Sequence, residues 1–410
     1  MVDVLKIGLI IAGIILLIRL KVPLSITLIA SALVLGLLFQ LPAGDLISAG
    51  RRAFLSLENL LLVIALQLVL LFSAVTRENG SMQRAISALT SAVRDARFTV
   101  AIIPAIVGLL PVVGGAMLSA PLVAEAADDL RLSPERRTFL NYWFRHVWEY
   151  TLPTFPAVFL TAGITGVSVG ALVTVDIPLT LAAVAVGVIF GFQGVAPFRH
   201  GAGPGSPREL WKHLADFARN LLPFFLVILL TVGLDLHLAY PLAAVTTGVI
   251  LLNRMPLGRL RQLAQQHLSV ELAFLIWGIM LFKEILQATR AMDHIAGELS
   301  AMGIPAVLLV VLVPALIAFI TGHTAAFVGL SFPVLVPFIQ PAELSVYYVM
   351  LGLASGICAH LLSPMHPCFA MTLQYYEAGM GETFRLLFMP VAAILLTGAC
   401  VFGAAFWLAG

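Results

Sequence analysis

Three ionisable side chains, Arg145, His146 and Glu149, lie close together in the sequence. They precede a predicted break in a helix that contains Pro153 and Thr154. The nearest upstream helix-start signal, Ser-Pro-Glu, lies about 15 residues before Glu149, which places that carboxylate roughly 22 Å along its helix. All three ionisable side chains lie within one helical turn, and Glu149 shares a face with both of the others. A carboxylate at that depth of an apolar chain predicts a proton or cation site. The alternative is a structural ion pair between Arg145 and Glu149.

Histidines take the corresponding place in the second half of the chain. His360 precedes a second Pro-x-x-Pro break that contains Ser363 and His366, and His323 lies in an interrupted apolar stretch upstream. The pKa values of Glu and His side chains can be shifted to near neutral pH by their surroundings. If these residues bind an ion, they therefore favour H⁺ over Na⁺. For each histidine the alternative is a buried packing role.

Gly-rich interruptions in two apolar stretches, 98–125 and 303–338, predict the tips of two re-entrant hairpins. Glycine lets the backbone approach a ligand, and half-helix N-termini beyond such turns favour an anion. The alternative is that the glycines serve helix packing. The tip residues that we expect to bind substrate or ion are Gly114, Gly115 and Ser119 in the first stretch, and Thr321, Gly322, His323 and Thr324 in the second.

Another pair of charges, Lys283 and Glu284, lies inside the apolar segment 269–288. Either could take part in ion coupling, although Lys283 could also extend its ammonium group out of the apolar region. Ser56 and Ser269 precede apolar segments and are predicted to cap the helices that follow.

The composition shows which kind of protein must position these groups. Of 410 residues, 60% are hydrophobic and 11% are charged, where a soluble domain carries about 25% charged residues. This excludes an ordinary soluble protein and a disordered chain. The net charge of +2 gives no sign of a nucleic-acid partner, and we expect none. The three cysteines (Cys358, Cys368 and Cys400) show no metal-site or disulfide spacing. We therefore expect an all-α polytopic membrane protein in a lipid bilayer, with no metal or other cofactor.

Two halves of similar layout organise the chain. Four short matches recur in the same order at offsets of 210 to 213 residues, and internal repeats are typical of secondary transporters. The first repeat is predicted at 1–195, a cytoplasmic linker at 196–217 and the second repeat at 218–410. The predicted segments are 3–20, 22–41, 57–76, 177–195, 218–236, 238–254, 269–288 and 385–408, with long broken helices at 139–175 and 342–376.

Charge distribution decides between hairpins and full crossings. With two hairpins each half crosses five times, so the repeats are inverted, and 17 basic residues gather on one side against 4 on the other. With two further crossings the division would be 13 to 8. The positive-inside rule favours the hairpins and places both termini outside.

The segments Pro111–Pro121 and Asn141–Glu149 resemble a family of prokaryotic membrane proteins, domain of unknown function 401, which is grouped with the ion transporter superfamily of gluconate permeases and divalent-anion/sodium symporters. The resemblance implies two inverted repeats, a homodimer, and an elevator-like unit that moves against a scaffold. The chain lacks the Ser-Asn-Thr hairpin signature of the dicarboxylate/sodium members and has Gly114, Gly115 and Ser119 at the first tip.

These features together predict a secondary active transporter, not an enzyme, in the prokaryotic plasma membrane. The expected substrate is a small organic anion, a carboxylate or sugar acid, coupled to H⁺ or Na⁺. Arg145 and the helix ends would bind the anion, and Glu149 with His360 or His366 would carry the coupling ion. The alternatives are a cation/proton antiporter, an intramembrane metal-dependent enzyme that uses His146 and Glu149 with His360 and His366, and a lipid or assembly partner that transports nothing.

Overall fold

The structure is a computed structural model that describes residues 2–93, 95–110, 115–198, 206–291, 295, 303–339 and 344–409. Its first half contains the helices α1 (Val2–Arg19), α2 (Leu24–Leu38), α3 (Ala43–Leu55), α4 (Leu57–Glu78), α5 (Ser81–Ala92), α6 (Ala96–Val107), α7 (Ala116–Asp128), α8 (Pro134–His146), α9 (Pro156–Thr165) and α10 (Val169–Gly191). Its second half contains α11 (Pro207–Ile228), the π-helical turn η1 (Leu229–Gly233), α12 (Ala239–Leu252), α13 (Leu257–His267), α14 (Val270–Thr289), α16 (Ala306–Thr321), α17 (Thr324–Leu335), the 3₁₀ turn η2 (Val336–Phe338), α18 (Ser345–Leu361), α19 (Pro367–Tyr376) and α20 (Met380–Ala409).

The protein is an all-α polytopic membrane protein, as the composition predicts. Within the described ranges, five helical segments are long and apolar enough to cross a bilayer: Leu57–Glu78, Val169–Gly191, Pro207–Gly233, Val270–Thr289 and Met380–Leu408. Several shorter apolar helices, among them α6 of the first predicted hairpin and both arms of the second, are too short to cross alone.

Local chemistry explains where the main helices begin. The Ser56 hydroxyl accepts a hydrogen bond from the Asn59 N–H, and the Ser269 hydroxyl accepts one from the Leu272 N–H, so both predicted caps are confirmed. Ser133 likewise caps α8, with Pro134 as its first residue. Capping satisfies N–H groups that have no partner within the helix.

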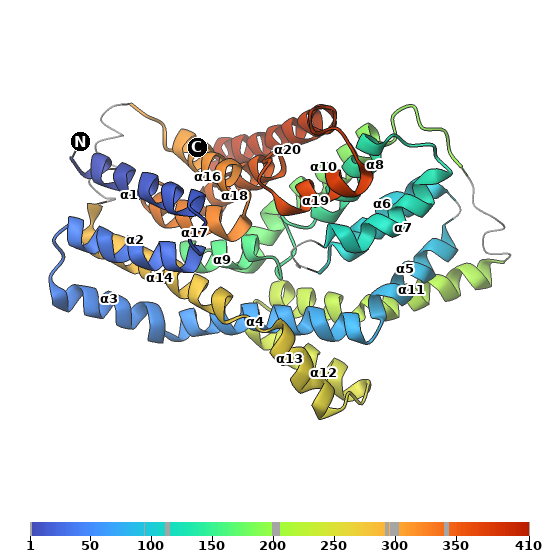
Figure 1. Ribbon diagram of the computed structural model, residues 1–410, viewed down its shortest axis with the longest axis horizontal. Coiled ribbons are helices and arrows are strands. Elements are labelled where there is room, and N and C mark those ends of the chain that lie inside the picture. Colours follow the sequence, from blue (N-terminus) through green and yellow to red (C-terminus); the bar gives the residue numbers. More distant parts are fainter. Residues whose placement is uncertain are drawn as a thin grey trace.

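Two layers are visible in Figure 1. The helices α2, α3, α4 and α14 lie along the lower side, and α8, α10 and α20 lie along the upper side. Helices from the two halves pack on each other in matched pairs: α2 contacts α14 while α12 contacts α4, and α9 contacts α17 while α19 contacts α7. Segments far apart in sequence therefore build the centre of the molecule together.

Both apolar stretches with interruptions form pairs of short helices in contact, α6 with α7 and α16 with α17. Gly322 joins the second pair with a φ of +60°, a conformation that glycine adopts without strain. Residues 111–114, including Gly114, lie outside the described residues.

Some predicted boundaries differ from the structure. The first broken helix was expected over the apolar segment 139–175; α8 begins at Pro134, at the predicted Ser-Pro-Glu start signal, but α9 ends at Thr165 because Gly166 takes a φ of +78°. The second half begins its first helix at Pro207 and not at 218, since Ser206 caps a charged, amphipathic start. The sequence prediction also omitted α3 and α13, which are amphipathic and therefore lack the long apolar run that identifies a crossing.

Candidate functional site

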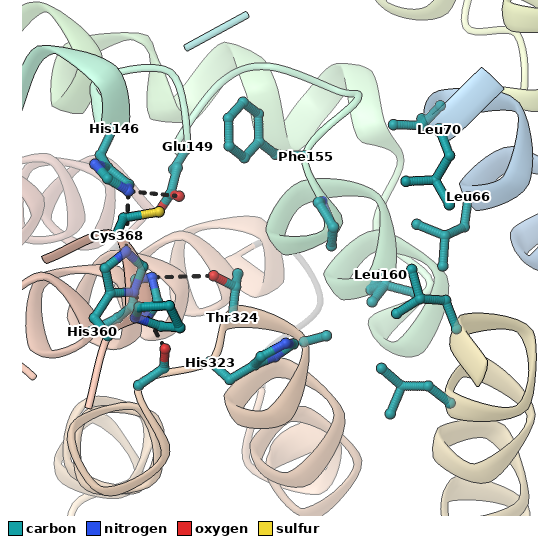
Figure 2. A pocket seen from close by; sticks show the side chains of 18 of the residues that line it. Leu66, Leu70, His146, Glu149, Phe155, Leu160, His323, Thr324, His360 and Cys368 are labelled. Atoms are coloured by element: carbon teal, nitrogen blue, oxygen red, sulfur yellow. Dashed lines mark hydrogen bonds and ion pairs between the residues drawn. The ribbon is translucent and has the colours of Figure 1, made fainter. Parts of the chain in front are cut away.

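A cavity of about 240 Å³ lies where α4 and α14 meet the broken helices and the second hairpin. Figure 2 shows that its two ends differ: His146, Glu149, Thr324 and His360 gather at one end, and Leu66, Leu70 and Leu160 line the other. We call it the central cavity. One wall is therefore apolar and the opposite wall carries the ionisable groups.

The end of α8 supplies three ionisable groups to the polar wall. Arg145, His146 and Glu149 are all buried, with exposed fractions of 3%, 1% and 4%. The guanidinium of Arg145 lies against Gly115, where any Cβ atom would collide with it. It also points toward the Leu110 carbonyl, 3.5 Å away. The absence of a side chain at position 115 therefore leaves room for the Arg145 guanidinium.

The second half contributes a chain of histidines to the same wall. The His360 and His366 rings meet edge to face, with centroids 3.9 Å apart. The Nε2 atom of His360 lies 3.4 Å from the Thr324 hydroxyl at the start of α17. His366 in turn reaches across the molecule, so that its Nε2 lies 3.2 Å from Nε2 of His146.

Three helices begin at the cavity wall. The starts of α9, α17 and α19 contribute Pro156, Thr324 and Pro367 to the lining, and no side chain caps any of these three ends. The N-terminus of a helix carries a partial positive charge and unpaired N–H groups. Of the described lining residues only Glu149 is acidic. The cavity is therefore suited to hold negative charge.

The central cavity brings together eight of the residues that were predicted to bind substrate or ion. They come from both halves of the chain and are Arg145, His146, Glu149, Gly322, His323, Thr324, His360 and His366. Thr321 lines a neighbouring cavity of about 290 Å³, which shares His323, Leu272 and Leu275 with the central one.

Other predicted residues lie near the breaks but do not line the central cavity. The Ser119 hydroxyl donates to the Asn141 side chain at 2.6 Å, joining α7 to α8. The Ser363 hydroxyl donates to the Phe319 carbonyl, and Thr154 is buried beside Pro153 in the first break. Of these residues, Ser363 ties the second break to α16.

Lys283 and Glu284 lie away from the central cavity. Glu284 forms an ion pair with Arg52 at 2.5 Å, and the Lys283 ammonium donates to the Gly163 carbonyl at 3.3 Å. Lys283 also lines a separate cavity of about 360 Å³ with Glu58, Asp235 and other residues.

Sequence reasoning missed two chemically capable residues. Cys368 lines the central cavity immediately after the second break. Asp176 is completely buried in α10, and neither of its carboxylate oxygens has a hydrogen-bond partner among the described residues. An isolated acid in an apolar helix is itself a signal, but it fell between the expected segments 139–175 and 177–195.

Replacement of Gly322 by Ala tests how tightly the second hairpin fits. Besides the left-handed φ, a Cβ there would collide with the backbone of Met365 and His366. We expect destabilisation by about 2–4 kcal/mol, measured as a lower melting temperature in detergent. Gly166→Ala is the matched control, because its φ is also positive but its Cβ would meet nothing. A loss of only about 1 kcal/mol for both variants would show that the contact with the break is unimportant.

Comparison with known proteins shows which solved structure has a similar fold. A search of curated proteins by sequence finds no match. Among solved structures the chain is similar to the crystal structure of the Alcanivorax borkumensis YdaH transporter, whose topology is described as unusual. The two are 16% identical with a TM-score of 0.62, and the match covers 97% of this chain and 99% of that one. At this identity the likeness concerns the fold.

The resemblance noted in the two sequence motifs extends over nearly the whole chain. Residues 3–405 match the family described as protein of unknown function (DUF401). The chain therefore belongs to the DUF401 family.

Proposed function

We propose that the protein is a secondary active transporter of a small organic anion, bound in the central cavity and coupled to H⁺ or Na⁺. The observation that carries the proposal is the convergence of three uncapped helix N-termini and the buried Arg145 on the central cavity. Helix N-termini and an arginine fork are suited to a carboxylate. The solved structure of similar fold is that of a transporter, which supports the same class of function.

Two inverted repeats, 1–195 and 218–410 with a linker between them, are part of the proposal. The matched helix contacts support it, since α6 contacts α8 as α16 contacts α18, and α10 contacts α18 as α20 contacts α8. A pseudo-twofold relation between the halves produces such pairs. Five crossings and one hairpin per repeat, with both termini outside a prokaryotic plasma membrane, follow from the charge distribution.

An elevator-type movement fits the two unlike walls of the central cavity. The wall from α4 and α14 is made of apolar side chains such as Leu66, Leu70 and Leu275, whereas the polar groups all belong to the hairpins and broken helices. A block that carries its ligand can slide along an apolar wall without breaking polar contacts to it. In this proposal α4 and α14 belong to a scaffold that forms a homodimer, as in the ion transporter superfamily.

The decisive experiment measures ligand binding and uptake with the purified chain. We expect one class among carboxylates, sugar acids and oxyanions to raise the melting temperature, by about 2.7 kcal/mol of stabilisation at 100 times its Kd. The same compound, radiolabelled, should accumulate in proteoliposomes that carry an inward Na⁺ or H⁺ gradient, and the two gradients identify the coupling ion.

Two results would contradict the proposal. A melting temperature that responds to Na⁺ or pH but to no anion, together with cation-driven proton movement, would favour a cation/proton antiporter. Binding without uptake under either gradient would remove the transport function.

A further inference from the structure

The His146 and His366 side chains face each other through their Nε2 atoms, 3.2 Å apart. On the far side of each ring, Nδ1 lies near a backbone carbonyl. The partner is Tyr142 for His146, at 2.6 Å, and Gly322 for His366, at 3.3 Å. A carbonyl oxygen only accepts hydrogen bonds, so each Nδ1 carries the proton and donates it.

This arrangement leaves two lone pairs in opposition. A neutral imidazole protonated at Nδ1 has a bare Nε2, and two such nitrogens at 3.2 Å repel each other. A cation between them turns the repulsion into two favourable contacts. Metal-binding histidines are typically held in this way, with the second ring nitrogen donating to a carbonyl or carboxylate.

A thiol lies beside the two histidines, and a carboxylate lies near one of them. The ligand atoms of His146, His366 and Cys368 all lie within 4.8 Å of one another, and all three side chains are buried. The Oε1 atom of Glu149 lies 3.9 Å from Nε2 of His146, and its Oε2 atom has no hydrogen-bond partner among the described residues. Figure 2 shows the Cys368 sulfur directed between His146 and Glu149.

The spacing of the two histidine nitrogens and the donor types fit a tetrahedral transition metal. Two nitrogens bound to one zinc ion at its usual bond length are about 3.3–3.4 Å apart, close to the separation of the two Nε2 atoms. Two imidazoles, a thiolate and a carboxylate are all common zinc ligands. The thiolate and the carboxylate together also balance the charge of a divalent ion in a site that Arg145 borders.

We propose that His146, His366 and Cys368 bind one divalent transition-metal ion of the zinc class, with Glu149 as the fourth ligand. The spacing in sequence gave no metal motif, because the ligands come from the ends of helices 220 residues apart. The inference goes beyond the proposed function, since metal binding is measured without transport. It stands or falls separately from the identity of the carried anion.

Cobalt(II) and zinc(II) are the probes, added to the full chain purified in detergent, freed of its affinity tag and treated with chelator. We expect one Co²⁺ per chain, with the intense visible bands of tetrahedral cobalt and a near-ultraviolet thiolate-to-cobalt charge-transfer band. Zn²⁺ should displace the Co²⁺ and raise the melting temperature. Metal binding should also release the thiol proton, detectable in weakly buffered solution.

Cys368→Ser should abolish the charge-transfer band and weaken binding about tenfold or more, and this nearly isosteric change leaves the fold intact. His366→Ala should lose the visible bands as well. Cys400→Ser, at an exposed thiol, is the matched control and should change nothing. Absence of tetrahedral cobalt bands in the wild type, or bands that persist in Cys368→Ser, would overturn the proposal; the first result would leave a shared proton as the cation between the two rings.

Discussion

Arg145→Gln is expected to weaken binding of the transported anion by about 30- to 1,000-fold, or roughly 2–4 kcal/mol. Arg145 is the one basic residue other than histidine among the described residues that line the central cavity. Its guanidinium is buried, so its attraction for an anion is little screened by water. Glutamine keeps a hydrogen-bond donor but removes both the charge and the planar fork.

The measurement is isothermal titration or thermal shift with the anion class that stabilises the wild type. Arg136→Gln is the matched control, because Arg136 lies on the same helix, is only half-buried, does not line the central cavity and donates to the Gln193 carbonyl. Arg145→Lys should recover only part of the affinity, since an ammonium group cannot bind a carboxylate through two parallel bonds. Equal affinity in the wild type and Arg145→Gln, with both folded, would remove Arg145 from the site.

Local features of the sequence predicted the parts of the fold that depend on local chemistry. Pro and Gly interrupt apolar runs at the hairpins and breaks, and Ser precedes the helices that it caps. Each of these signals acts within a few residues. The segments α3 and α13 escaped prediction because an amphipathic helix does not show a long apolar run.

The candidate site was predictable as a set of residues but not as an arrangement. Burial cost alone draws attention to Glu149 and the histidines in an apolar chain. That His146 meets His366, and that Cys368 joins them, depends on packing between the two halves. No pattern in a single sequence carries such long-range contacts. Lys283 and Glu284 illustrate the converse, since the same burial argument applies to them although their partners, Gly163 and Arg52, lie elsewhere.

Asp176→Leu is expected to stabilise the protein by about 1–3 kcal/mol, although most substitutions in a core destabilise it. Both oxygens of Asp176 are buried without a hydrogen-bond partner among the described residues. A buried polar group of this kind loses its hydrogen bonds to water on folding and forms no new ones, so its burial costs free energy. Leucine places a methyl group where aspartate has each oxygen, so it fills nearly the same space without this cost. The rise in melting temperature in detergent measures the effect.

Thr180→Val is expected to have the opposite effect on stability. Thr180 lies on the same face of α10 as Asp176, one turn further along. Thr180 shares a 2.9 Å hydrogen bond with the Thr151 hydroxyl and donates to the Val147 carbonyl at 3.3 Å. Valine is isosteric with threonine but breaks both bonds, so we expect a loss of about 1–2 kcal/mol. Two polar-to-apolar changes four residues apart should therefore shift stability in opposite directions, because only one of the two side chains has partners. A lower melting temperature for Asp176→Leu would mean that the carboxylate is satisfied in the membrane by a bound cation or water, and that its burial is not a cost to the fold.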